Sequence, residues 1–428
     1  MKRLAAAWLS AALTCAAAVW FLPARPAAAQ EPVVLQYAYW GAPEAEERVI
    51  ALFKERHPGI DIQMITLEGG TTGSAASLFV MAAAGVLPDM FALSGTQGTP
   101  PQFIDAGLLL DLTPYMERDG IREEDFIPNA WNYAKRDGRI WGWPRATYGI
   151  SLGTAIIAYN RNMYDAAGLP YPEPGWTFAD YVENARKMTL DTSGDGVIDQ
   201  WGSAQMGRSW WQVFVWSNGG ELLNDDMTDV RLHEPEAIAG LQWMADLIHV
   251  HRVAPIQNGQ GNFERGTAAM AQVSLSSAYR GYRDLEYDWS LTVPPRGPSG
   301  DSGYSIGGSN ILAVSARTRH PEAVWSFLKF LADPEVHAIE VFEWQQATPN
   351  LRSVAVSERF LYYDGPPYDL SAIVFHNPSK PTPQHRNWPR LNSLVTDIVV
   401  NQLFSGQQSA QSAITGALPA LRAALRAE

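Results

Sequence analysis

Aromatic side chains that could stack against a ring-shaped ligand are frequent in this chain, which has 16 tryptophans among 428 residues. The flat C–H faces of a sugar pack against indole and phenol rings, so an excess of tryptophan can indicate a carbohydrate site. Tryptophan also packs well in protein cores, and we interpret Trp176 and Trp325 as structural. The aromatic candidates for ligand contact are Trp40, Trp210, Trp211, Tyr279 and Trp388.

Polar side chains in loops could bind the hydroxyl groups at the rim of a sugar. The candidates are Ser94, Gln97, Arg145, Tyr148 and Arg280. Ser94 and Gln97 are each followed by a glycine, whose lack of a side chain lets a loop approach a ligand closely. Arg145 could donate to two hydroxyls or to an anion, and its alternative role is a salt bridge that holds a hinge.

One loop resembles the start of a calcium-binding loop. Oxygen-bearing side chains stand at its positions one, three, five and nine, which are Asp191, Ser193, Asp195 and Asp199. Position twelve is Gly202, where such loops need a bidentate glutamate. The alternative is a polar turn after a helix, so we expect no cofactor and leave calcium open.

Linear motifs of common hydrolases and nucleotide-binding proteins are missing from the sequence. It contains no GxSxG, no HExxH and no GxxxxGK[ST], which argues against these enzyme classes and against an ATP site. The two carboxylates of a glycosidase leave no linear pattern. A secreted carbohydrate-active hydrolase therefore remains the alternative to a non-catalytic receptor.

The first thirty residues have the layout of a secretory signal. Lys2 and Arg3 precede an apolar run over residues 4–22, and three alanines occupy residues 27–29. A positive start, an apolar stretch and a small-residue cleavage site predict a signal peptide over residues 1–29, and a retained membrane helix is the alternative. The single cysteine, Cys15, lies inside this segment, so a cleaved chain has no disulfide.

The net charge of −13 at pH 7 makes nucleic acid an unexpected partner, because an acidic surface repels phosphate backbones.

Secondary structure that could position these residues is clearest at the start. Strand patterns at 33–39, 60–65 and 90–93 alternate with helical patterns at 43–56 and 75–84. This order predicts a parallel sheet, with ligands beyond the carboxyl ends of its strands, where Trp40 and Ser94 fall. Later segments read as extended at 140–144, 150–159, 289–293 and 305–314, and as helical at 235–250, 320–331, 334–342, 391–404 and 410–424.

Trp210 and Trp211 are interpreted as neighbours in a strand. Adjacent strand residues point to opposite faces, so one indole is expected in the core and the other against the ligand. Trp388 is expected near the start of a late helix.

Several strings together resemble the extracellular solute-binding proteins that serve sugar importers, including maltose-binding proteins. In order they are AAAGVLPDMF (82–91), AGLLLDLTPY (106–115), IWGWP (140–144), IIAYN (156–160), MYDAAGL (163–169), WTFADYVENARKMTL with DTSGDGVIDQWG (176–202), SNGG (217–220), RGTAAM (265–270) and PEAVWSFLKFLAD (321–333). Each string is weak alone, and their common order over most of the chain makes the resemblance specific.

The resemblance implies a two-lobed α/β periplasmic-binding-protein fold of type II, with hinge strands and a cleft between the lobes. It places residues 30–145 and 306–345 in lobe one, and residues 146–305 and 346–428 in lobe two, with the C-terminal helices partly shared. The implied function is to capture a carbohydrate and deliver it to an ABC transporter permease. Arg145 and Arg280 keep a glycerol-phosphate-type ligand open.

The implied location is the periplasm or the outer face of the cell membrane, and the implied state is a monomer. We further expect that Trp211→Ala or Trp388→Ala weakens ligand binding without unfolding the chain.

Overall fold

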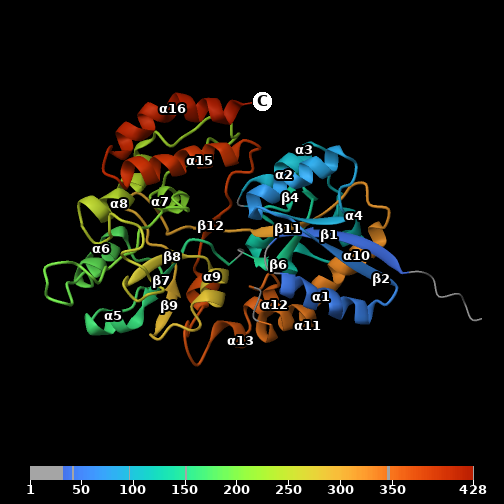
Figure 1. Ribbon diagram of the computed structural model, residues 1–428, viewed down its shortest axis with the longest axis horizontal. Helices are drawn as coiled ribbons and strands as arrows, with labels where there is room; N and C mark the ends of the chain where they lie inside the picture. Colours follow the sequence, from blue (N-terminus) through green and yellow to red (C-terminus); the bar gives the residue numbers. More distant parts are fainter. Residues whose placement is uncertain (1–31, 41–42, 96, 150–151, 345–347, 428) are drawn as a thin grey trace, which may run out of the picture.

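The computed structural model of the protein describes residues 32–40, 43–95, 97–149, 152–344 and 348–427, without the side chains of residues 45, 71–72 and 146–149. The predicted signal peptide, residues 1–29 with Cys15, lies outside this part. Figure 1 shows two lobes, each built around its own sheet, with connecting segments between them. The two-lobed α/β fold predicted from the sequence is confirmed.

The first lobe contains a five-stranded sheet in the order β2-β1-β3-β11-β6. Its strands are β1 (Val33–Tyr39), β2 (Ile60–Thr66), β3 (Met90–Leu93), β6 (Trp143–Gly149) and β11 (Ser309–Val314). β1 is parallel to both β2 and β3, whereas β11 is antiparallel to β3 and β6. The predicted parallel arrangement of the first three strands is therefore confirmed.

Helices cover both faces of this sheet (Figure 1). On one face, Phe53 of α1 (Pro43–Arg56) packs edge-on against Phe327 of α10 (Pro321–Leu331), with ring centroids 5.0 Å apart. On the other, Phe79 of α2 (Gly70–Ala83) stacks on Phe103 of α3 (Thr99–Asp105) at 4.2 Å. A mostly parallel sheet needs apolar cover on both faces, and these rings supply it.

The second lobe contains a three-stranded antiparallel sheet in the order β8-β7-β9. Along its central strand, Ile156 and Ala158 pack into one hydrophobic cluster, and Ile157 and Tyr159 into another. This alternation is the period of a strand buried on both faces. The elements of this lobe are β7 (Ile156–Asn160), β8 (Met270–Val273), β9 (Trp289–Thr292), α5 (Arg161–Ala166), α6 (Phe178–Lys187), α7 (Gln212–Ser217), α8 (Pro235–His249), α9 (Leu275–Gly281), α15 (Trp388–Ile398) and α16 (Ala410–Arg426).

Three segments cross between the lobes and bond to one another. The first crossing, after β6, exchanges two backbone hydrogen bonds between Thr154 and Ile306, both of 2.9 Å. The second crossing contains β10 (Ser305–Ile306), which pairs in parallel with β12 (Ser379–Lys380) of the third. The three crossings are thus joined to one another by backbone hydrogen bonds.

Most predicted elements are confirmed, with several differences of extent. Of the segment predicted as extended over 150–159, residues 150–151 lie outside the described part, and the strand β7 begins at Ile156. α2 begins at Gly70 rather than at residue 75. The predicted helix over 334–342 consists of α11 (Pro334–Ala338) and the π-helix η3 (Ile339–Glu343). The late helix begins at Trp388 and ends in the π-helix η4 (Val399–Leu403), so the expected place of Trp388 is confirmed.

The segment from residue 348 onward contacts both lobes, since Leu351 pairs with Phe126 and α14 contacts β9. Across the described ranges, no helix has both the length and the apolar character that a bilayer crossing requires. The remaining elements are α4 (Thr113–Asp119), η1 (Glu123–Asp125), η2 (Pro128–Trp131), β4 (Lys135–Arg136), β5 (Arg139–Ile140), α12 (Arg352–Ala355), α13 (Glu358–Leu361) and α14 (Ser371–Phe375).

Candidate functional site

The strand order reverses between β1 and β3 at one end of the first sheet. β1 lies between β2 and β3. The chain therefore continues from β1 towards one side of the sheet, where β2 lies, whereas β3 lies on the opposite side of β1. In open α/β sheets, ligands bind outside the carboxyl ends of strands where the order reverses in this way. Trp40 follows β1 and Ser94 follows β3, and both are buried. The backbone N–H of Gly95 donates to Oδ1 of Asn310 at 3.1 Å, which ties this edge to β11.

A contact between the lobes lies beside this end of the sheet. Trp388 begins α15 of the second lobe, and a Cβ at Gly98 of the first lobe would lie 3.3 Å from its ring. On its other side, Trp388 meets Trp211 with ring centroids 6.2 Å apart. The structure therefore brings four predicted site residues to one place, namely Ser94 and Gln97 near Gly98, Trp211, and Trp388.

The two indoles of this contact are closed off from solvent, each with 0% of its surface exposed. Neither indole N–H has a hydrogen-bond partner within the described part of the chain. A buried donor without a partner is unfavourable unless another state or a bound molecule supplies an acceptor. In this conformation neither donor is accessible to a ligand.

Trp210 and Trp211 do not lie in a strand, so that interpretation is wrong. They lie in a turn that leads into α7, where Trp211 occupies the N-cap with φ −57°. The turn still sends the two rings to different surroundings, because Trp211 is buried and Trp210 is half-buried. The two rings are therefore separated by the turn at the start of α7 and not by the alternation of a strand.

Tyr279 and Arg280 lie in α9, and their contacts are local. The hydroxyl of Tyr279 lies 3.1 Å from that of Tyr363, and the two rings pack edge-on. Arg280 is exposed, and its Nε donates to the carbonyl of Ser276 at 3.2 Å. Ligand contact by these two residues stays a prediction, and the side chain of Tyr148 lies outside what the structure describes.

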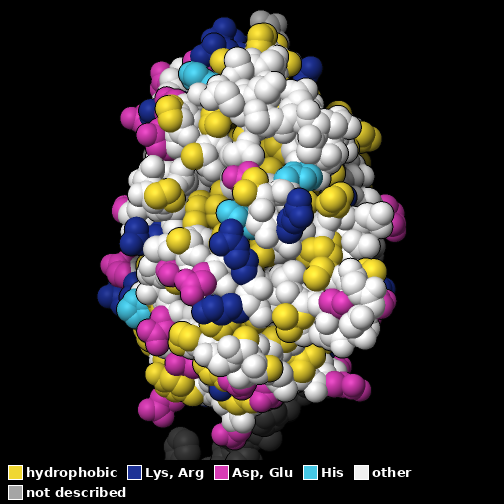
Figure 2. Space-filling model, turned by 90° about the vertical axis from the view of Figure 1, so that its left-hand side faces the viewer, with side chains coloured by type: hydrophobic (Ala, Val, Ile, Leu, Met, Phe, Trp, Pro, Cys, Tyr) yellow, Lys and Arg dark blue, Asp and Glu magenta, His cyan; other side chains and the backbone are white. Residues whose placement is uncertain are grey.

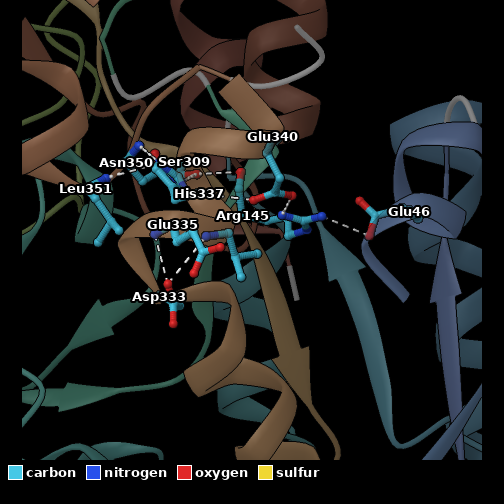
Figure 3. A network of polar contacts seen from close by, with 10 residues as sticks. Glu46, Arg145, Ser309, Asp333, Glu335, His337, Glu340, Asn350 and Leu351 are labelled. Atoms are coloured by element: carbon cyan, nitrogen blue, oxygen red, sulfur yellow. Dashed lines mark hydrogen bonds and ion pairs between the residues drawn. The ribbon is translucent and has the colours of Figure 1, made fainter. Parts of the chain in front are cut away.

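Arg145 lies at the centre of a buried polar network (Figure 3). Its guanidinium, 2% exposed, donates from Nη1 to Glu340 Oε1 at 2.6 Å and from Nη2 to Glu46 Oε2 at 3.2 Å. Burial alone would lower the pKa of Arg145, but the carboxylates of Glu340 and Glu46 outweigh it and raise the pKa. The structure shows the salt bridge that the sequence left as the alternative, and it joins β6 to α1 and η3.

His337 connects this network to the segment that follows η3. Its Nε2 accepts the backbone N–H groups of Asn350 at 3.0 Å and Leu351 at 3.4 Å, and its Nδ1 lies 3.8 Å from Glu340 Oε2. Burial, together with the charge of Arg145, lowers the pKa of His337 to about 3. A neutral imidazole is therefore part of the folded state, because a protonated Nε2 could not accept these bonds.

His337 should make stability fall with acidity. Its pKa of about 3 in the folded state lies below the usual value of about 6.5 for an unfolded chain. The unfolded chain therefore binds the extra proton between these values, so the stability that His337 contributes is present above pH 6.5 and is lost as the pH falls towards 3. Lowering the pH from 7.5 to 5 should cost about 2 kcal/mol in urea unfolding experiments.

The matched variant is His337→Gln, whose amide oxygen can accept a backbone N–H but does not titrate. Its unfolding free energy should change less over the same pH range. A wild-type profile no steeper than that of His337→Gln would contradict the assigned role.

The candidate calcium loop satisfies its carboxylates with its own backbone. Asp191 accepts the N–H groups of Gly194 and Gly196, both at 2.7 Å, and Asp199 accepts the N–H of Thr192 at 2.8 Å. Hydrogen bonds from Gly196 lower the pKa of Asp191, as those from Thr192 do for Asp199. Within the described ranges, no three His, Cys, Asp or Glu residues are placed to hold a metal. This geometry supports the polar turn, and calcium binding stays a prediction.

A further residue that packs at this end of the sheet, Tyr133, was not found from sequence. The ring of Tyr133 occupies the space that side chains at Gly95 and Gly308 would need. Its hydroxyl accepts the N–H of Thr382 at 3.1 Å, which ties the third crossing to the first lobe. Burial raises the pKa of Tyr133 to about 12. No local pattern marks it, because its partners are far along the chain.

Comparison with known proteins places the chain in one family. The profile of the bacterial extracellular solute-binding proteins matches residues 37–338. Among curated relatives, the sn-glycerol-3-phosphate-binding periplasmic protein UgpB of Shigella dysenteriae is 23% identical over 369 residues, which is 81% of this chain and 79% of the relative.

Solved structures share the fold at low sequence identity. The substrate-binding protein Lmo0181 of Listeria monocytogenes, in complex with cycloalternan, gives a TM-score of 0.76 at 21% identity, covering 91% of this chain and 98% of the other. The sugar-binding protein MalE of Xanthomonas citri gives a TM-score of 0.76 at 19% identity, covering 92% of this chain and 97% of the other. UgpB of Mycobacterium tuberculosis, in complex with glycerophosphocholine, gives a TM-score of 0.74 at 19% identity, covering 92% of this chain and 98% of the other.

Proposed function

Because the chain belongs to the bacterial extracellular solute-binding proteins, we propose that it captures a small hydroxyl-rich ligand between its lobes and delivers it to an ABC transporter permease. The observation that carries this proposal is the buried indole pair Trp211 and Trp388 of the second lobe, which packs against Gly98 of the first lobe and whose N–H groups lack partners in the described residues. Ligand oxygens could accept from these donors, and ligand C–H faces could pack on the rings.

The capture of the ligand follows from the different contacts that it makes when the lobes are apart and when they are together. With the lobes apart, a ligand touches one of them; with the lobes together, it touches Ser94 and Gln97 on one side and Trp210 and Trp211 on the other. Binding therefore favours closure by the free energy of the additional contacts. The bonded crossing strands let the lobes move as rigid bodies, so a permease can distinguish a loaded receptor by its shape.

The buried charges of the described residues favour an uncharged carbohydrate over a phosphate as the ligand. Arg145 is the one Lys or Arg that is buried among the described residues, and two carboxylates already neutralise it. A phosphate in the cleft would need a buried cation that is free to pair with it. A glycerol-phosphate-type ligand is the second candidate, favoured by the name of the curated relative that covers most of the chain.

A thermal-shift and calorimetry panel tests the ligand class. It should contain maltose, maltotriose, glycerol 3-phosphate and glycerophosphocholine. At about one hundred times its dissociation constant, a true ligand should stabilise the protein by about 2.7 kcal/mol. We expect a saccharide to do so; stabilisation by the phosphate compounds alone would overturn the uncharged-ligand proposal.

The remaining properties belong to the same proposal. The chain is exported through its predicted signal to the periplasm or outer cell surface, works as a monomer without nucleic acid or metal, and releases its ligand unchanged. Recovering bound saccharide after incubation and analysing it for new reducing ends tests the last point, since cleavage would support the hydrolase instead. Calcium should leave the unfolding temperature of the ligand-free protein unchanged.

A further inference from the structure

We propose that the second lobe carries an additional binding site, away from the interlobe contact, for a small aromatic carboxylate. The site is a pocket of about 940 Å³ between α6 and α8. These helices lie at the left-hand edge of Figure 1, which is the face that Figure 2 turns towards the viewer. A volume of this size is ordinary for sites that bind small molecules.

The floor of the pocket is aromatic. Phe178 of α6 and Trp243 of α8 stack with ring centroids 4.0 Å apart and an interplanar angle of 15°. Ala179 and Ala239 are exposed on the two facing walls, so small side chains leave the space above the floor open. A flat ring that enters this space would pack on apolar surface from both helices.

Two buried polar atoms in the pocket lining lack partners in the described residues. They are Nε1 of Trp243 and Oδ1 of Asn218, on side chains that are 9% and 1% exposed. Native structures seldom leave such atoms unpaired. Both atoms are themselves closed off from solvent, so the choice of ligand rests on the aromatic floor and on the cation at the mouth.

A cation at the mouth selects an anionic ligand. Nη2 of Arg186 lies 2.9 Å from Nδ1 of His251, and this contact orients the guanidinium. Two carboxylates also line the pocket: Glu183 pairs with Lys187 at 2.9 Å, whereas Asp246 accepts from the neutral amide of Gln242 at 2.8 Å and keeps its charge. Arg186 has no ion pair in the described part of the chain. Figure 2 shows cationic side chains beside apolar ones on this face.

An aromatic carboxylate matches the aromatic floor and the cation at the mouth together. Its ring covers the stacked floor, and its carboxylate accepts the free N–H groups of Arg186 in the planar arrangement that guanidinium favours. The pocket lies within one lobe, so occupation need not compete with a ligand between the lobes. The proposal therefore stands independently of the receptor function.

Calorimetry with 2-naphthoate tests the site on the full protein without its signal peptide. We expect one equivalent of 2-naphthoate to bind, and the neutral 2-naphthalenemethanol to bind about tenfold more weakly. Ala239→Trp, which fills the pocket, should abolish binding. Arg186→Gln should weaken naphthoate binding about tenfold and remove the preference for the acid over the alcohol.

Ala51→Trp, which adds an indole to an exposed position of α1, is the matched control and should bind naphthoate as the wild type does. Ala179→Trp fills the pocket from the opposite wall and serves if Ala239→Trp lowers the unfolding temperature. Absence of naphthoate binding at about 1 mM, the upper end of weak specific affinities, would overturn the proposal. Equal binding by the wild type and both filled variants would overturn it as well.

Discussion

Replacing Arg145 by methionine should lower the free energy of unfolding by about 3–5 kcal/mol. The substitution keeps an unbranched side chain but removes the charge that lies between Glu46 and Glu340, and both carboxylates are at most 2% exposed. Two buried anions would then face each other without a cation, which costs more than the lost attraction alone. Urea unfolding followed by tryptophan fluorescence measures the change directly.

A matched control is Arg122→Met, which removes an arginine from an exposed ion pair. Arg122 lies 2.6 Å from Asp125, with 65% of its side chain exposed. Exposed pairs contribute about 0–1 kcal/mol. Removing all three charges with Glu46→Gln, Arg145→Met and Glu340→Gln should recover part of the loss. Equal destabilisation by Arg145→Met and Arg122→Met would contradict the buried network.

The strand–helix order of the first lobe was predictable because its patterns are local. Alternation in Val33–Tyr39 and helical spacing in Pro43–Arg56 depend on residues next to each other, and both bounds agree with the structure. The start of α2 was missed because the sequence Gly70-Thr-Thr-Gly73 contains weak helix formers. The π-helix Ile339–Glu343 was missed because one widened turn leaves no distinct spacing.

The place where the strand order reverses followed from the sequence pattern, but the side-chain contacts there did not. Arg145 meets partners that are 99 and 195 residues away in sequence. Likewise, Gln212 beside Trp211 bonds to Asn392 across 180 residues. Sequence could nominate an arginine or an indole, yet the burial of each depends on segments whose approach no local pattern reports. The family resemblance supplied the lobes and their order, and packing decides which rings are accessible.

Trp388→Ala is expected to lower the free energy of unfolding by about 3–5 kcal/mol. The indole has no exposed surface and fills the space between Gly98 of the first lobe and Trp211 of the second. Removing it leaves a cavity where the lobes touch, and surrounding atoms only partly collapse into such a space. This differs from the expectation from sequence alone, that the substitution weakens ligand binding and leaves folding intact.

The variant Trp210→Ala distinguishes an effect on ligand binding from an effect on stability. Trp210 is half-buried, so its truncation removes less packing and should cost less stability than that of Trp388. If Trp210 stacks on the ligand, its loss should weaken binding in calorimetry while the urea midpoint stays close to that of the wild type. Unfolding of Trp388→Ala at the wild-type midpoint would show that the ligand-free protein does not rest in this closed packing. The indole N–H groups that lack partners here would then be hydrogen-bonded to water in the ligand-free protein.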